Sequence, residues 1–254
     1  MNHKVATMIE IPKKLLIALL LMVSYQAYAS SPLTQHTLAV SQSMSAFYMY
    51  ALTDGDKRYE EEYKHYFSVA DQHLQSYQQQ EAQFAGELKV KWGKLRQYLT
   101  FEYVEDVGYI VSSQTRMQYR QYLNTLYGKL SNSINSETNF QEQLMLMLLD
   151  VELMSARFFD IASSVSGPMN LSSNDLVIDP PAMAKALDVK LQKLLNSSAT
   201  KSINKNLKLV SRKWNFIEDS VINYKEQAAF LLVYYNKGQI NKLINKSQNV
   251  MAGT

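Results

Sequence analysis

Glu62 and His65 have the spacing closest to a catalytic motif, because Glu-x-x-His pairs hold the metals of di-iron helical bundles. Such a centre needs a second pair of the same kind and two further inward carboxylates, and the sequence contains no second Glu-x-x-His. A solvent-exposed helix face explains the pair more simply. A metal enzyme with Glu62 and His65 as ligands is therefore only the third of three functional hypotheses.

The sequence contains few other side chains or motifs that commonly take part in catalysis. Cysteine is absent, no glycine-rich phosphate loop is present, and the histidines are His3, His36, His65 and His73. Nucleophilic, metal-assisted and nucleotide-dependent chemistry each need parts that this sequence does not combine. The sequence therefore predicts a protein that is not an enzyme and that carries no cofactor.

Tyrosines recur every three or four residues along a helix expected from residue 57 to about residue 84. The residues that share this face are Tyr59, Tyr63, Tyr66, Ala70, His73 and Tyr77. Buried tyrosine hydroxyls need hydrogen-bond partners, so we expect either a wet core or the wall of a polar pocket. His73 is interpreted as a core histidine or as a pH-sensitive group.

Two tryptophans, Trp92 and Trp214, have a structural and a functional interpretation. They are either core anchors or walls of a pocket between helices, where helical bundles commonly hold ligands. The candidate ligand-binding residues are therefore Tyr59, Tyr63, Tyr66, His73, Tyr77, Trp92 and Trp214.

Basic residues line one face near the end of the chain, at Lys201, Lys205, Lys208 and Arg212. Residues 201–254 contain nine Lys and Arg against three Asp and Glu, so an acidic partner or membrane headgroups could dock there. A solvated outer face is the simpler interpretation. The net charge of the whole chain is only +3, which argues against general nucleic-acid binding.

The strongest helical pattern covers residues 203–235, where apolar and aromatic residues alternate at spacings of four and three. These residues are Ile203, Leu207, Val210, Trp214, Ile217, Val221, Tyr224, Ala228, Leu231 and Tyr235. Such a repeat is typical of one long helix packed along other long helices. With only 8 Gly and 5 Pro, the sequence predicts an all-α protein, an elongated antiparallel helical bundle.

The other helices are expected over residues 33–52, 57–84, 87–130 with a break at Ser112-Ser113, 139–165 and 181–195. The helix over 139–165 is apolar on more than one face, so it should be the most buried. Gly86 is expected to separate two helices, and Gly238 is expected to bend or end the last one. Residues 166–181 contain two proline sites and should form the longest loop.

Two units are expected, residues 30–130 and residues 139–254, joined by the polar linker 131–138 and packed together as one bundle. Met44-Ser45-Ala46 recurs as Met154-Ser155-Ala156, and Trp92 recurs as Trp214. A duplicated three-helix unit explains these repeats. The alternative is chance, since amphipathic helices resemble one another whatever their origin.

Residues 1–29 have the pattern of a secretory signal peptide. Lys13 and Lys14 precede nine consecutive apolar residues, and Ala27-Tyr28-Ala29 matches a cleavage site. Cleavage near Ala29 would remove three lysines and one glutamate, leave a net charge of +1, and place the protein in the periplasm or outside the cell. A retained anchor is the alternative, although the run is short of the ~20 residues that span a bilayer. No later segment is apolar enough to cross a membrane.

The stretch Tyr50-Ala-Leu-Thr-Asp-Gly-Asp-Lys-Arg-Tyr-Glu-Glu-Glu-Tyr63, followed by Leu74, resembles the first helical hairpin of four-helix-bundle sensory ectodomains. These ectodomains belong to bacterial chemoreceptors and histidine kinases. The resemblance covers about 50 residues and implies a sensory-type binding domain without its own transducer, while it transfers no binding residue.

The leading functional hypothesis is a non-enzymatic periplasmic module that binds a small ligand or an envelope protein partner. The alternative is a structural or scaffold subunit of an envelope or secretion complex, or a secreted helical effector. Both hypotheses leave the oligomeric state and the ligand open.

Overall fold

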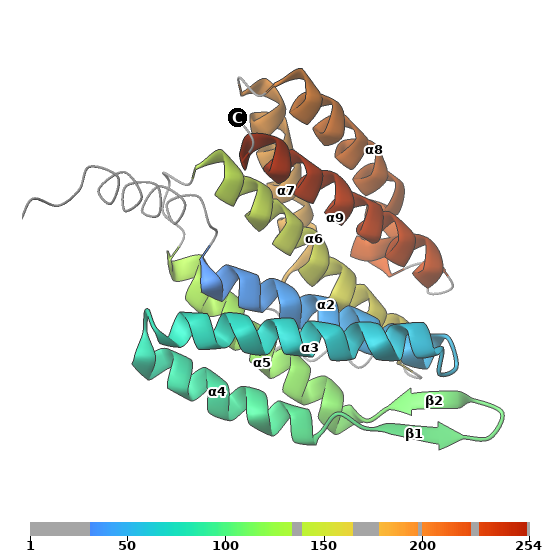
Figure 1. The fold of residues 1–254 in the computed structure, drawn as a ribbon. Coiled ribbons are helices and arrows are strands. Elements are labelled where there is room, and N and C mark those ends of the chain that lie inside the picture. Colours follow the sequence, from blue (N-terminus) through green and yellow to red (C-terminus); the bar gives the residue numbers. More distant parts are fainter. Residues whose placement is uncertain (1–30, 134–138, 165–177, 198–199, 225–228, 253–254) are drawn as a thin grey trace, which may run out of the picture. The chain divides into compact units, whose positions relative to one another are not determined.

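Eight helices and one β-hairpin make up the part of the chain that the computed structural model describes, which is residues 31–133, 139–164, 178–197, 200–224 and 229–252 (Figure 1). The helices are α2 (Pro32–Leu52), α3 (Lys57–Gln78), α4 (Ala82–Gln97), α5 (Ser113–Ser133), α6 (Phe140–Ala162), α7 (Pro180–Asn196), α8 (Lys201–Asn223) and α9 (Phe230–Ala252). The strands are β1 (Phe101–Val104) and β2 (Gly108–Val111). The all-α class is confirmed.

Helix α2 is buried on nearly all sides, although it carries many hydroxyl groups. The Ser31 side chain caps its first turn by accepting from the Thr34 N–H, and Pro32 fits the first turn because no hydrogen bond is lost there. Buried hydroxyls such as those of Thr37 and Ser41 donate to carbonyls of their own helix. They therefore need no partner from elsewhere, and α2 can be enclosed like an apolar helix.

The turn between α2 and α3 depends on two residues, Gly55 and Asp56. Gly55 has a φ of 85°, a left-handed conformation that glycine adopts without strain, and the Asp56 carboxylate caps α3 by accepting from the Arg58 N–H. The ring of Tyr109 lies where a β-carbon on Gly55 would sit. The hairpin therefore closes over this turn and fixes it.

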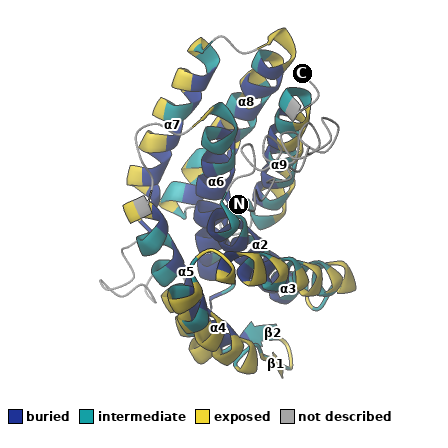
Figure 2. Ribbon diagram, turned by 60° about the vertical axis from the view of Figure 1, so that its left-hand side comes forward, coloured by how far each residue is buried: buried dark blue, intermediate teal, exposed yellow. Residues whose placement is uncertain are grey.

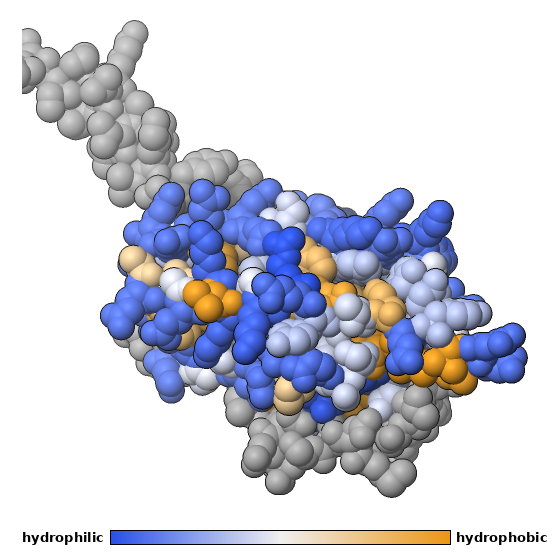
Figure 3. All heavy atoms as spheres, turned by 90° about the horizontal axis from the view of Figure 1, so that it is seen from below, coloured by the Kyte–Doolittle hydropathy of each residue, from blue (hydrophilic) through white to orange (hydrophobic). Residues whose placement is uncertain are grey.

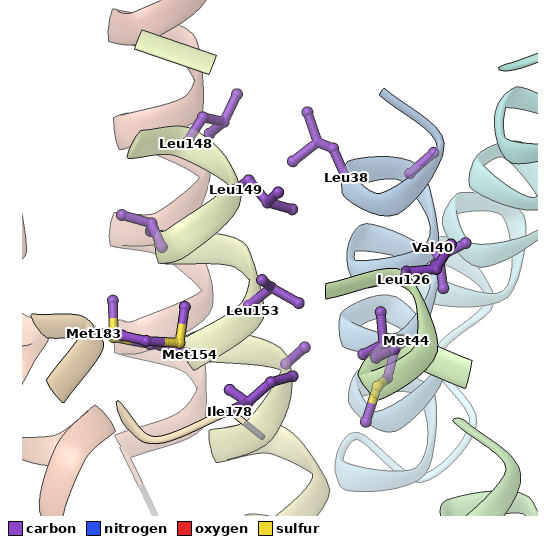
Figure 4. Close-up of a cluster of buried hydrophobic side chains, with 14 of the residues drawn as sticks. Leu38, Val40, Met44, Leu126, Leu148, Leu149, Leu153, Met154, Ile178 and Met183 are labelled. Carbon is purple, nitrogen blue, oxygen red and sulfur yellow. The ribbon is translucent and has the colours of Figure 1, made fainter. Parts of the chain in front are cut away.

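Among the described residues, each half of the chain has four helices arranged as a closed ring, in contrast to the predicted three. In the first half α2 and α4 each contact both α3 and α5, and in the second half α6 and α8 each contact both α7 and α9. The two rings meet where α2 packs on α6, and these two helices are the most buried in the protein (Figure 2). Figure 4 shows Leu149 and Leu153 of α6 facing Leu38 and Met44 of α2. Residues 31–254 thus form a unit with its own core.

The prediction for residues 79–111 is wrong in two respects. The expected helix to residue 84 ends at Gln78, and Gly86 lies inside α4, where it faces open space and breaks nothing. The expected continuation of the next helix is instead the β1–β2 hairpin, in which Phe101 pairs with Val111 and Val104 pairs with Gly108. Left-handed Asp106 and Gly108 close this hairpin in a short loop, and its aromatic face packs on α2.

The single long helix predicted over residues 203–235 is also wrong. Helix α8 ends where Tyr224 adopts a left-handed φ of 52°, and α9 begins anew at Phe230. The predicted seam is buried from Ile203 to Val221, whereas Leu231 and Tyr235 are exposed. Because α9 packs antiparallel to α8, it buries a different face, which contains Val233, Ile240 and Ile244. Gly238 lies within α9 and ends nothing.

Other predictions agree with the structure or lie outside the residues it describes. Helices α2, α6 and α7 match the expected segments closely, and the Asn139 side chain caps α6. The signal segment 1–29, most of the linker 131–138 and most of the loop 166–181 fall outside the described residues. Within the described residues, every helix is too short or too polar to cross a bilayer.

Candidate functional site

Three aromatic side chains from three helices pack together inside the first group of four helices: Trp92 and Tyr122 are stacked, and the His36 imidazole lies edge-on to both. Tyr122 of α5 lies parallel to Trp92 of α4, with 5.3 Å between ring centroids, and its hydroxyl lies 2.8 Å from Nε2 of His36 in α2. His36 Nδ1 lies 2.8 Å from the Ala70 carbonyl oxygen, so Nδ1 carries the proton and Nε2 accepts from Tyr122. Burial lowers the pKa of His36 to about 4, and the imidazole is neutral at physiological pH.

A cleft lies over this stack, between α4 and α5, with a volume of about 450 Å³. Tyr122 contributes to its floor, and the other lining residues are polar or basic: Lys91, Lys94, Gln118, Gln121, Asn124 and Thr125. The lining contains two ammonium groups and no carboxylate. The cleft can therefore attract an anion and surround it with amide and hydroxyl groups. Figure 3 views the molecule from the side of α4 and the hairpin, where most of the described surface is hydrophilic.

The wall formed by α4 is held in place from its other side. The Trp92 Nε1–H donates to Asp71 Oδ1 of α3 over 2.7 Å, and Arg96 donates to Asp71 Oδ2 over 2.8 Å. Charge-assisted bonds of this kind are stronger than neutral ones. They tie α4 to α3 while His36 and Tyr122 tie α5 to α2, so both walls of the cleft are fixed before any ligand arrives.

A second polar cluster joins α5 to α6 around Asp160. Arg116 donates to Asp160 Oδ1 over 2.8 Å, Arg120 donates to Oδ2 over 2.6 Å, and Arg157 lies 3.6 Å from Oδ2. The cavity beside them has a volume of only about 10 Å³, which holds a single water molecule. This cluster is thus a buried cross-link between the two rings of helices and has no room for a ligand.

A third polar cluster links α6 to α9. The buried Glu152 carboxylate accepts from Lys237 Nζ over 2.9 Å and also from Asn241. The Lys237 ammonium lies 4.6 Å from the centroid of the Tyr234 ring. Both charges are almost fully enclosed, so each charge is compensated by the other in place of water.

The predicted tyrosine face of α3 is distributed over three environments. Tyr63 joins an aromatic cluster with Phe47 and Phe101, and Tyr77 donates to Glu81. Tyr59 packs edge-on against Tyr234 of α9. Tyr66 and His73 are half-buried. The buried residues of α3 are Phe67, Ala70, Leu74 and Tyr77, so Ala70 and Tyr77 of the predicted face are buried, whereas Phe67 and Leu74 take the place of their neighbours Tyr66 and His73. Hydrocarbon side chains enter a core without needing partners.

The seven predicted ligand-binding residues are therefore not gathered at one site. None of the seven lines the cleft, although Trp92 stacks on Tyr122, which does. Trp214 is fully buried in α8, in the other half of the chain. The four basic residues predicted as a contact face, Lys201, Lys205, Lys208 and Arg212, are all exposed on α8.

Glu62 and His65, the ligands that a metal enzyme would need, are not part of the cleft lining. Glu62 is half-buried, whereas His65 is exposed and packs beside Tyr66. Among the described residues, no three acidic, histidine or cysteine side chains come together in a way that could hold a metal ion.

Most residues that line the cleft were not among the residues predicted from the sequence to form a site. Lys91, Lys94 and the polar residues of α5 look like ordinary solvated positions, and nothing in their spacing shows that α4 and α5 stand apart at the surface. His36 offered a signal that could have been used, because a histidine in a buried helix requires hydrogen-bond partners.

Comparisons with known proteins found no matching family model, no matching curated protein and no matching solved structure.

Proposed function

We propose that this protein is a non-enzymatic binding module that takes a small anionic ligand into the cleft between α4 and α5. The observation that carries the proposal is the lining of the cleft, where Lys91 and Lys94 stand opposite a row of amides and a hydroxyl with no acid among them. Such a lining suits a carboxylate or phosphate that carries further hydrogen-bonding groups.

The geometry supports binding rather than chemistry. His36, which contacts the lining residue Tyr122, has both ring nitrogens engaged and a pKa near 4. A general base needs a free nitrogen and a pKa nearer the working pH. In this proposal, His36 and Trp92 hold Tyr122 in position, and the ligand contacts come from the exposed lysines and amides.

We also propose that the module works outside the cytoplasm, as a sensory-type domain without its own transducer. The support for this part is the signal-like segment 1–29 and the resemblance of residues 50–63 to sensory ectodomains. Fractionation of cells that express the tagged chain tests the compartment, and a tagged product in the cytosol with its leader attached would contradict it.

Isothermal titration calorimetry tests the cleft. The ligands are dicarboxylates, acidic amino acids, uronic acids and inorganic phosphate, measured against the wild type and the double variant Lys91→Gln/Lys94→Gln. We expect at least one ligand to bind the wild type, and we expect the variant to lose about tenfold or more in affinity, since two charge-assisted contacts disappear.

The matched control is Lys89→Gln, which removes one positive charge from an exposed position of α4 outside the cleft lining. Its affinity should stay within about twofold of the wild type, because exposed charges that do not touch the ligand act only weakly. The proposal fails if no ligand on the panel binds, or if Lys89→Gln weakens binding as much as the double variant does.

A second function, an interaction protein of the cell envelope, is favoured by a separate observation. Large apolar side chains are exposed together where α8 ends and α9 begins, namely Phe216, Leu231, Leu232 and Tyr235. A soluble module whose only task is to bind a small ligand has no use for such a surface.

A further inference from the structure

The end of α8 and the start of α9 present four large apolar side chains to solvent. Their exposed fractions are 65% for Phe216, 53% for Leu231, 54% for Leu232 and 61% for Tyr235. Single exposed apolar residues are ordinary, but a group of them on neighbouring helices marks an interaction surface. We refer to these four residues as the apolar corner.

Basic residues continue from the apolar corner along both helices. On α8, Lys201, Lys205, Lys208, Arg212 and Phe216 recur at spacings of four and three, so they share one face, and all five are exposed. On α9, the same spacing rule aligns Leu231 and Tyr235 with the exposed Lys242 and Lys246. The acids of these two helices are Glu218 and Asp219, both in α8, and α9 has none.

The two faces form one surface because α8 and α9 are antiparallel neighbours. Lys213 Nζ of α8 lies 5.8 Å from the centroid of the Tyr235 ring, and Asn206 donates to Ser247 over 3.2 Å. The apolar end of α8 therefore lies beside the apolar end of α9. The segments of the two helices that carry the basic residues also lie side by side. The buried faces of both helices point the opposite way, into the core.

We propose that this surface of α8 and α9 docks on an anionic phospholipid bilayer. The apolar corner would enter the boundary between headgroups and acyl chains, while the lysines and Arg212 would contact lipid phosphates. Each basic residue near an anionic membrane contributes about 1 kcal/mol, a factor of about five in binding. Apolar burial and electrostatic attraction together characterise helices that lie in the membrane interface.

The composition of the surface favours a membrane over an acidic protein partner. Its cations are almost all lysines, which are depleted from protein interfaces, and their flexible stems suit a fluid array of phosphates. Neither cavity described above includes a residue of α8 or α9. This inference is independent of the ligand proposed for the α4–α5 cleft.

Vesicle flotation tests the proposal with the chain from residue 30 onward, which retains the whole compact unit and lacks the apolar segment 1–29. The vesicles are phosphatidylcholine alone and phosphatidylcholine mixed with phosphatidylglycerol. We expect binding to the anionic vesicles only, weakening as salt is added. Lys205→Gln/Lys208→Gln/Arg212→Gln should lower the partition coefficient on the order of 100-fold. Phe216→Ser/Tyr235→Ser should lower it by about tenfold or more.

Two controls match these variants. Lys57→Gln/Lys89→Gln/Lys185→Gln removes the same charge from exposed positions on α3, α4 and α7, and Val90→Ser/Val107→Ser removes two exposed apolar side chains from α4 and the hairpin. Both should bind vesicles within about threefold of the wild type. In a Phe216→Trp variant, anionic vesicles should shift the emission maximum of the introduced tryptophan to shorter wavelength, and brominated lipid should quench this emission. Circular dichroism confirms that each variant is folded.

Several results would overturn the proposal. Among them are equal binding to neutral and anionic vesicles, no binding to either, and control variants that lose as much as the test variants. A dimer in light scattering that Phe216→Ser/Tyr235→Ser dissociates would reassign the surface to contact between two copies of the chain.

Discussion

His36 should make the stability of this protein depend on pH in a predictable way. The imidazole is enclosed by α2, α3, α4 and α5, and burial lowers its pKa from 6.5 to about 4. Between these two values the unfolded chain binds a proton that the folded chain does not. Acidification in this window therefore favours the unfolded state, and stability falls as the pH falls.

The magnitude follows from the two pKa values. Relative to neutral pH, His36 alone removes about 1.4 kcal/mol of stability at about pH 5.5 and about 2.5 kcal/mol at about pH 4.5. The loss levels off at roughly 3 kcal/mol once the pH is below both values. His73 adds to this in the same direction, because partial burial also lowers its pKa.

Urea unfolding of the wild type, His36→Gln and His73→Gln across this pH range isolates the effect. Glutamine cannot titrate, and every other ionisable group is shared, so the difference between two curves reports one histidine. We expect the His36→Gln curve to flatten relative to the wild type by about 2.5 kcal/mol between neutral pH and about pH 4.5, and the His73→Gln curve to flatten less. Parallel curves for the wild type and His36→Gln would refute the reasoning, since they would mean that the imidazole is accessible to protons in the folded state.

Two further predictions concern buried polar groups. Lys237→Met leaves Glu152 charged and enclosed without its cation and should cost about 3–5 kcal/mol of unfolding free energy, whereas Glu152→Gln/Lys237→Met should recover most of that loss in thermal or urea unfolding. A double variant as unstable as the single one would contradict this account. Trp92→Phe removes an indole N–H with a carboxylate partner, while the Nε1–H of Trp214 has no hydrogen-bond partner among the described residues. Trp92→Phe should therefore destabilise the protein by about 1–2 kcal/mol more than Trp214→Phe in the same assay, and the reverse order would disprove the role of the Asp71 bond.

Local features of the fold could be predicted because their causes lie within a few residues. The apolar rhythm of α6, the caps provided by Ser31, Asp56 and Asn139, and the left-handed turn at Gly55 each depend on neighbours in the chain. The predicted seam of α8 is buried as far as Val221 for the same reason.

The candidate site could hardly be predicted, because its residues are ordinary one by one. Lys91 and Lys94 have the character of solvated helix positions, and only the separation of α4 from α5 places them opposite Gln118 and Gln121. The spacing of the α3 tyrosines predicted that they share one buried face. A face shifted by one residue fits the same helical spacing equally well. Packing buries Phe67 and Leu74 in preference to Tyr66 and His73 because hydrocarbon needs no hydrogen-bond partner, while the buried Tyr77 donates its hydroxyl to Glu81.

The sequence by itself determined that the chain is helical, where most helices begin, and that its basic residues concentrate near the end. These properties follow from composition, capping residues and short-range periodicity. Only the tertiary structure decided that α8 and α9 are separate helices, that residues 101–111 form a hairpin, and that exposed Phe216 and Tyr235 lie on neighbouring helices. A heptad pattern of apolar residues can continue across a break between two helices, so the pattern alone does not locate the break. The partner that buries each face comes from a distant part of the chain, so the choice between equivalent local patterns is made by packing.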